Sequence, residues 1–330
     1  MIEFQKKGDF QLKKSNWAVL VLLLMAAFTL GACGSKDSAG PPAKDPADGS
    51  KDKLHAVVTF SILHDIVNEV GGDRVSVHSM VPIGTAPHEY DPLPEDVKKT
   101  ADADVIFYNG LNLEGGKEGW FFRLLDTTGA DGSKVFELME GVEPLYLSDN
   151  KGQEGEINPH AFLDPTVGIQ MVENARDAFV KADPAHKDEY EGNAEKLLDQ
   201  LRGIDQEYKD KIADIPEENR ILVTSERAYQ YLANSYGLEE GYIWAIDTEE
   251  NGSPAQIKSL VNLIREREVP ALFVESNVDR RPMETVSKET GVPIVHELYS
   301  DELGKPGSEG GTYLDFLRYN IENIHDGLSK

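Results

Sequence analysis

Four side chains of the sequence have the chemistry of divalent-metal ligands: His88, His160, Glu226 and Asp301. His88 lies in GTAPHEYDPLPED, where prolines that fix φ stiffen the loop. His160 follows a proline in NPHAFLDP, directly ahead of an expected helix. Imidazole and carboxylate groups together suit a cation that accepts both nitrogen and oxygen donors.

Each of these residues also has a simpler interpretation. A histidine in a loop is usually a surface residue, and the chain has eight histidines. Glu226 would complement the dipole at the start of a helix. Asp301 would be an ordinary turn residue. The residue types alone therefore leave a metal site and four unrelated surface positions as alternatives.

The remaining histidines are weaker candidates. His55 and His78 fall within expected strands, and His186 and His325 fall on polar helical stretches. His64 follows the first strand, and His296 stays an outside candidate because it is close to Asp301. Glu275 ends a strand, and we expect it to support the site as a structural carboxylate.

Strands and helices alternate through both halves of the chain. Strands are predicted at 54–60, 73–82, 103–110, 220–225, 242–246, 270–275 and 292–298, and helices at 61–72, 164–183, 226–236, 254–266, 281–290 and 312–328. This order predicts an α/β fold with two lobes, each a parallel, four-stranded type of sheet covered by helices. Ligands bind beyond the carboxyl ends of such strands, and the four candidates lie there, two in each lobe.

Residues 183–216 break the alternation with a long, charged stretch that has only a thin apolar line: Tyr190, Leu197, Leu201, Ile204, Tyr208 and Ile212. A helix of roughly 30 residues spans about 45 Å. Such a polar helix suits a rigid link between two lobes. We therefore expect an N-terminal lobe at 54–182, a linking helix at 183–216 and a C-terminal lobe at 217–330.

The first 32 residues read as an export signal. Four lysines precede an apolar run from Trp17 to Leu30, and LGAC ends at Cys33, the only cysteine. This pattern matches the lipobox of bacterial lipoproteins, in which the cysteine is acylated; a short uncleaved anchor is the alternative. Residues 33–53 are rich in Gly, Ser, Pro and charge and predict a flexible tether. A single cysteine forms no internal disulfide.

The net charge of −26 disfavours nucleic acid as a partner. It suits a cation-gathering site or a body held near a membrane. We expect a monomer.

Several long motifs resemble one family, in order from about residue 54 to 330: APHEYDPLPEDV, NPHAFLDP, VTSERAYQYLANSYGL, VPALFVESNVDRRPMETVS and LYSDELG. They are similar to the metal-binding lipoproteins of bacterial manganese ABC transporters. The resemblance implies that His88, His160, Glu226 and Asp301 bind the metal and that Cys33 carries the lipid. It also implies partnership with a permease and its ATPase, at the outer face of the cytoplasmic membrane.

The ligand types favour manganese over zinc. Zinc prefers four tetrahedral ligands rich in His and Cys. Two imidazoles and two carboxylates offer up to six donors, which Mn²⁺ tolerates, and Fe²⁺ remains possible. Zinc-delivering relatives tend to have His at the position of Glu226 and a His-rich loop between the first two ligands, whereas residues 89–159 here contain no histidine.

Three other functions are weighed against this one: a zinc-specific binding protein of the same family, a lipid-anchored adhesin and a lipid-anchored metallohydrolase. A hydrolase needs an open coordination position for water. The sequence has neither H-E-x-x-H nor G-x-S-x-G, so we expect no enzyme activity.

Overall fold

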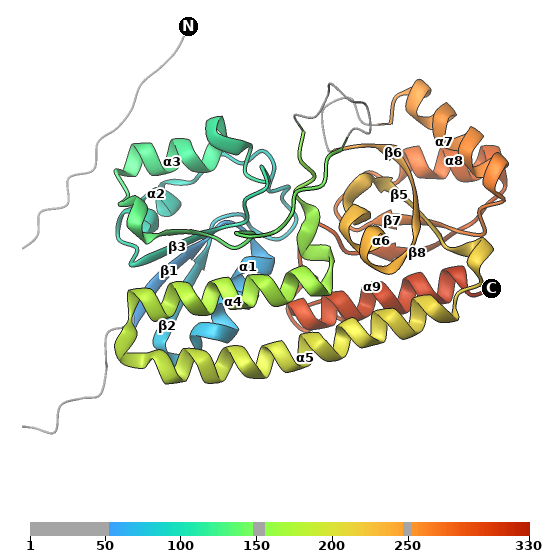
Figure 1. The fold of residues 1–330 in the computed structure, drawn as a ribbon. Helices are drawn as coiled ribbons and strands as arrows, with labels where there is room; N and C mark the ends of the chain where they lie inside the picture. The colour runs from blue at the N-terminus through green and yellow to red at the C-terminus, as the bar shows by residue number, and fades with distance from the viewer. Residues whose placement is uncertain (1–52, 148–155, 247–251) are drawn as a thin grey trace, which may run out of the picture. The chain divides into compact units, whose positions relative to one another are not determined.

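The computed structural model of the chain describes residues 53–147, 156–246 and 252–330 (Figure 1). The predicted signal peptide, Cys33 and all but the last residue of the predicted tether lie outside these ranges. Residues 51–330 form one compact unit. In the described ranges, no helix combines the length and the apolar character needed to cross a membrane.

The N-terminal lobe is a parallel sheet with helices packed around it. Its elements are β1 (Leu54–Val58), α1 (Ser61–Gly71), β2 (Val75–Ser79), α2 (Pro94–Ala101), β3 (Val105–Tyr108), α3 (Trp120–Thr128), β4 (Val135–Glu137) and α4 (Pro165–Ala182). The strand order is β2-β1-β3-β4, with Val57 in register with both His78 and Ile106. The predicted parallel, four-stranded sheet is confirmed here.

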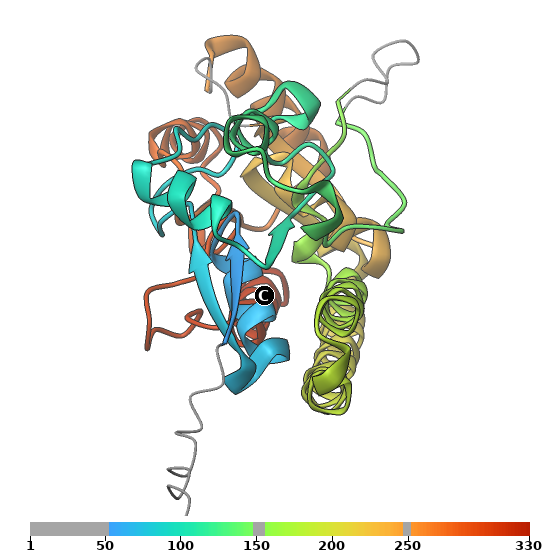
Figure 2. The same cartoon turned by 90° about the vertical axis from the view of Figure 1, so that its left-hand side faces the viewer.

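The linking helix is α5 (Lys187–Asp214), and it packs against α4, α1 and α9. All six residues of the predicted apolar line are buried along it. Figure 2 shows α4 and α5 lying side by side. Pro216 follows the helix, where its ring prevents continuation.

The C-terminal lobe repeats the alternation. It contains β5 (Ile221–Glu226), α6 (Gln230–Tyr236), β6 (Glu239–Trp244), α7 (Pro254–Arg267), β7 (Leu272–Glu275), α8 (Arg281–Thr290), β8 (Ile294–Leu298) and α9 (Tyr313–Leu328). All its strands pair in parallel, as β5-β6 and β7-β8. Strands β5 and β7 are neighbours, and the Glu275 side chain, rather than a regular ladder, links their carboxyl ends.

The two lobes share a hydrophobic core. One buried cluster runs from the N-terminal sheet through α4 and α5 to α6 and α9, and a second, smaller cluster lies within the C-terminal lobe. Helix α9 joins the lobes directly, because Asp65 of α1 accepts a hydrogen bond from the backbone N–H of Tyr313 at 2.7 Å. The Tyr313 hydroxyl donates to the carbonyl of Phe162. The lobes are therefore connected by more than the predicted linking helix.

Candidate metal centre

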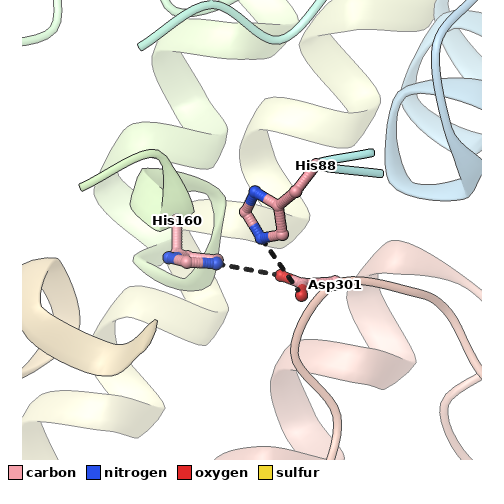
Figure 3. A group of neighbouring side chains, drawn as sticks. All are labelled: His88, His160 and Asp301. Atoms are coloured by element: carbon pink, nitrogen blue, oxygen red, sulfur yellow. Dashed lines mark ion pairs between the residues drawn. The ribbon is translucent and has the colours of Figure 1, made fainter. Parts of the chain in front are cut away.

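Three of the four predicted ligands converge in one buried place. The candidate donor atoms of His88, His160 and Asp301 all lie within 4.8 Å of one another. Figure 3 shows the Asp301 carboxylate facing both imidazoles, with Nε2 of His160 at 3.1 Å from Oδ1 and Nε2 of His88 at 3.5 Å from Oδ2. The two lobes thus contribute to one cluster, as their positions at strand ends led us to expect.

Glu226 lies next to this group but is not one of the three residues whose donor atoms are all within 4.8 Å of one another. Its Oε1 is 3.7 Å from Nε2 of His160, and both side chains are completely buried. It is the last residue of β5, so the strand fixes its backbone beside the cluster. The structure therefore brings all four predicted residues together. Glu226 contacts the group at His160.

The spacing suits donors that surround one small cation. Two donor atoms that each lie about 2 Å from a shared ion are up to about 4 Å apart. The three distances of 3.1, 3.5 and 3.7 Å fall within this limit. Nitrogen and oxygen donors are both present, and the described residues contain no other group of three or more such side chains.

Electrostatics favour an ionised Asp301. Burial alone would raise the pKa of this carboxyl, but His160 and His88 beside it hold the pKa well below its usual range. An anion this deeply enclosed must be compensated by positive charge. The histidines supply that compensation in the metal-free protein, and a cation would supply it when bound.

His88 is supported from the N-terminal lobe. The indole Nε1–H of Trp120 donates to the carbonyl of Pro87, the residue before His88, at 2.9 Å. Tyr90 packs edge-on against Trp120 at a centroid distance of 5.3 Å. The His88 side chain is 8% exposed, the most accessible of the four. A cavity of about 530 Å³ lies beside it, lined in part by Glu89, Asp91 and Trp120.

The loop after β3 leads toward Trp120 and is held by a buried carboxylate. Gly110, Leu111 and Asn112 all have positive φ, which is costly for Leu111. Buried Glu114 holds this loop, accepting from the backbone N–H groups of Asn109 and Gly110. Burial raises the pKa of Glu114 to about 7, although these hydrogen bonds oppose the rise.

Glu226 and Asp301 have their own supports in the C-terminal lobe. Glu275 accepts from the backbone N–H of Glu226 at 2.8 Å and of Ser225 at 3.1 Å. Burial raises the pKa of Glu275 to about 7 against the effect of these bonds. Asn277 donates to Oδ2 of Asp301 at 3.1 Å. The expected structural role of Glu275 is confirmed.

Four of the other histidines pair with carboxylates away from the cluster: His78 with Asp96, His186 with Asp183, His296 with Asp326 and His325 with Asp214. Neither His64 nor His296 belongs to the group around Asp301. Within the described residues, His88 and His160 are the histidines that the structure groups with Asp301.

Sequence reasoning missed the residues that hold these ligands. Oδ1 of Asn158 lies 3.1 Å from the backbone N of His160 and 2.8 Å from Nδ1 of its ring. A short amide two residues before a candidate ligand is a usable local signal. Trp120 and Asn277 gave no comparable signal, because each is far in sequence from the loop or ligand that it supports.

Comparison with known proteins assigns the chain to a family of metal-binding proteins. Residues 56–327 match the family described as zinc-uptake complex component A, periplasmic. The chain therefore belongs to this family. It is 44% identical over 312 residues to the manganese ABC transporter substrate-binding lipoprotein PsaA of Streptococcus mitis, covering 94% of this chain and 98% of the relative. Over the same coverage it is 43% identical to the metal ABC transporter substrate-binding lipoprotein ScbA of Streptococcus cristatus.

Solved structures agree on the fold. The S38A mutant of the Mn-bound periplasmic metal-binding protein from Candidatus Liberibacter asiaticus superposes with a TM-score of 0.77 at 31% identity, over 84% of this chain and all of that one. The periplasmic zinc-binding protein TroA from Treponema pallidum gives a TM-score of 0.75 at 27% identity, with the same coverage. The two-lobed α/β fold is thus shared with proteins that bind manganese and zinc.

Proposed function

We propose that the protein is the substrate-binding lipoprotein of a metal ABC importer and that it captures Mn²⁺ between its two lobes. The convergence of His88, His160, Glu226 and Asp301 in one buried place carries this proposal. The names of the relatives, which include manganese ABC transporter substrate-binding lipoproteins, support the same function. Fe²⁺ is the alternative cargo closest in ligand preference.

The chemistry of the ligands supports manganese as the cargo. Glu226 and Asp301 offer up to four oxygens in addition to two imidazole nitrogens. Mn²⁺ uses such a mixed, high-coordination shell, whereas zinc favours four tetrahedral donors. Zinc binding remains the outcome to test against, because TroA, a structural relative, is a zinc-binding protein.

The protein would carry its metal without transforming a substrate. His160, Glu226 and Asp301 are at most 2% exposed, so a bound ion would be enclosed. A hydrolytic metal needs a coordination position open to water and substrate. Burial of the ligands therefore favours cargo over catalysis.

Delivery would follow from the anchor and the lobes. Lipidation at Cys33 would hold the body at the outer face of the cytoplasmic membrane through the tether at 33–53. Lobes at 54–182 and 217–330, linked by 183–216, would enclose the ion until a permease and its ATPase receive it.

Metal content tests the proposal. The protein, stripped of metal and offered Mn²⁺, should bind one equivalent by mass spectrometry, and His88→Ala should lose it. A wild-type protein that binds no manganese would contradict the proposed cargo.

A further inference from the structure

Asn158 is buried completely, and every polar group that it has is hydrogen-bonded. Its backbone N–H donates to the carbonyl of Leu145 at 2.8 Å, and its carbonyl accepts from the hydroxyl of Tyr231 at 2.9 Å. The side chain makes four further contacts, described below. A buried amide held on all sides has one orientation, because rotating it would leave several groups unsatisfied.

The partners fix which side-chain atom is oxygen. One atom lies 3.1 Å from the backbone N–H of His160, which can only donate, so this atom is Oδ1. The other atom, Nδ2, donates to the carbonyl of Arg227 at 2.8 Å and to Oε1 of Gln230 at 3.0 Å. Gln230 is fixed in the same way, because its Nε2 donates to the carbonyl of Tyr146.

This orientation places a proton on Nδ1 of the His160 ring. Oδ1 of Asn158 also lies 2.8 Å from Nδ1 of His160. Since an amide oxygen can only accept, Nδ1 must carry a proton. The opposite nitrogen, Nε2, is then the one that faces Asp301 at 3.1 Å and Glu226 at 3.7 Å.

We propose that Asn158 is a positioning residue that fixes the proton of His160 on Nδ1 and so reserves Nε2 for the metal. The effect of this contact on manganese binding rests on the proposed function. Partners of this kind orient metal-binding imidazoles and raise their basicity.

The same amide ties the two lobes together beside the site. Arg227 directly follows Glu226, and Gln230 is the first residue of α6. Asn158 therefore holds the His160 segment against the chain that carries Glu226. This half of the site is therefore arranged before metal arrives.

The first test reads the protonation of His160 in the protein with Asn158 unchanged. The metal-free and zinc-loaded proteins, labelled with ¹⁵N at histidine, are compared by NMR at neutral pH, with His160→Gln identifying the His160 signals. We expect a slowly exchanging proton on Nδ1 in both states. A metal-free His160 that carries a proton only on Nε2 overturns the proposal, whether or not the protein binds manganese.

Three variants separate ring orientation from packing. Asn158→Leu removes the acceptor, and we expect loss of the Nδ1 proton signal and about 10- to 100-fold weaker Mn²⁺ binding. Gln230→Leu removes one of the two contacts that Nδ2 makes across the lobes and leaves the Oδ1 contact to the His160 ring intact. The Nδ1 proton signal should therefore persist, and the affinity should fall less. Asn174→Ala is the matched control, since its amide bonds two backbone carbonyls within the N-terminal lobe.

The pattern among these variants decides the proposal. Asn158→Leu with wild-type manganese affinity would mean that the contact of Asn158 with the His160 ring does not matter for binding. Gln230→Leu with a loss equal to that of Asn158→Leu would mean that lobe packing and not the ring state controls binding. Failure of the wild-type protein itself to bind manganese would instead count against the proposed function and leave the NMR result standing.

Discussion

Nε2 of His160 lies 3.1 Å from Oδ1 of Asp301, although His160 precedes α4 in the N-terminal lobe and Asp301 follows β8 in the C-terminal lobe. No local pattern in the sequence produces this contact. It exists because both lobes place the carboxyl ends of their strands at the same place, where a shared core holds them. A cation bound by both residues would sit between these two atoms.

Glu226 should be essential for manganese binding. Glu226→Ala removes one of two anionic ligands, and we expect the affinity to fall by more than the about 10- to 100-fold that loss of an outer partner costs. Titration calorimetry measures the effect, and circular dichroism should show an intact fold. Glu297→Ala, which removes an exposed glutamate of β8, is the control and should bind normally. Wild-type affinity in Glu226→Ala would remove Glu226 from the site.

Glu275 should be essential for the fold around Glu226. Its two oxygens accept from two backbone N–H groups, so an amide NH₂ at this position would point a donor at a donor. We expect Glu275→Gln to lower the free energy of unfolding of the metal-free protein by about 1–3 kcal/mol, as for other unmatched buried groups. Urea unfolding measures this, and an unchanged free energy would show that the link between β5 and β7 is dispensable.

Asp65 should make stability depend on pH. Burial raises its pKa to about 6 from 3.8, although the hydrogen bond from Tyr313 opposes the rise and nearby Glu69 and Asp315 add to it. Since the folded state binds this proton more tightly than the unfolded state, the stabilising contribution is complete below about pH 4 and is lost as pH rises through 6.

Asp65→Asn removes this dependence while keeping an oxygen for Tyr313. We expect the free energy of unfolding of wild type relative to the variant to decrease between pH 4 and 7, by up to about 3 kcal/mol. Asp73→Asn, at an exposed position, should follow the wild-type curve. Parallel curves for wild type and Asp65→Asn would contradict the assignment.

Metal loading should move the lobes little. Helix α5 runs past both lobes, and the hydroxyl of Tyr208 on α5 donates to the carbonyl of Leu317 on α9 at 2.8 Å. One hydrophobic cluster also spans both lobes. We therefore expect small-angle scattering profiles of metal-free and manganese-loaded protein to superpose. A clear decrease in the radius of gyration on loading would instead indicate a wide hinge closure.

Most of the fold could be predicted from the sequence, because long, strongly periodic segments report their burial directly. The prediction for 312–328 matches α9 to within one residue, whereas β6 begins at Glu239 and not at 242. Two glutamates at the start of β6 made it resemble a loop. Helices α2 and α3 and strand β4 were missed because they are short, at 8, 9 and 3 residues, and short segments give a weak periodic signal.

The ligands of the site could be predicted because each follows an identifiable strand or precedes a helix. Their supports could not, because Trp120, Asn277 and Gln230 act across the fold and nothing in their local sequence marks them. The contacts that join the two lobes could not be predicted for the same reason. Asp65 and Tyr313 are polar or amphipathic residues on separate helices, and their contact appears only once α9 has packed against α1.

Competition between manganese and zinc tests the central claim most directly. The experiment uses residues Gly34 to Lys330, which omit Cys33, the single cysteine of the sequence. This protein is stripped of metal and offered both ions. Mass spectrometry measures which ion binds, and X-ray absorption measures its coordination geometry. We predict one tightly held Mn²⁺ with mixed nitrogen and oxygen donors, and a distorted zinc complex. Ideal tetrahedral zinc with scarcely any manganese bound would contradict the account and identify a zinc carrier.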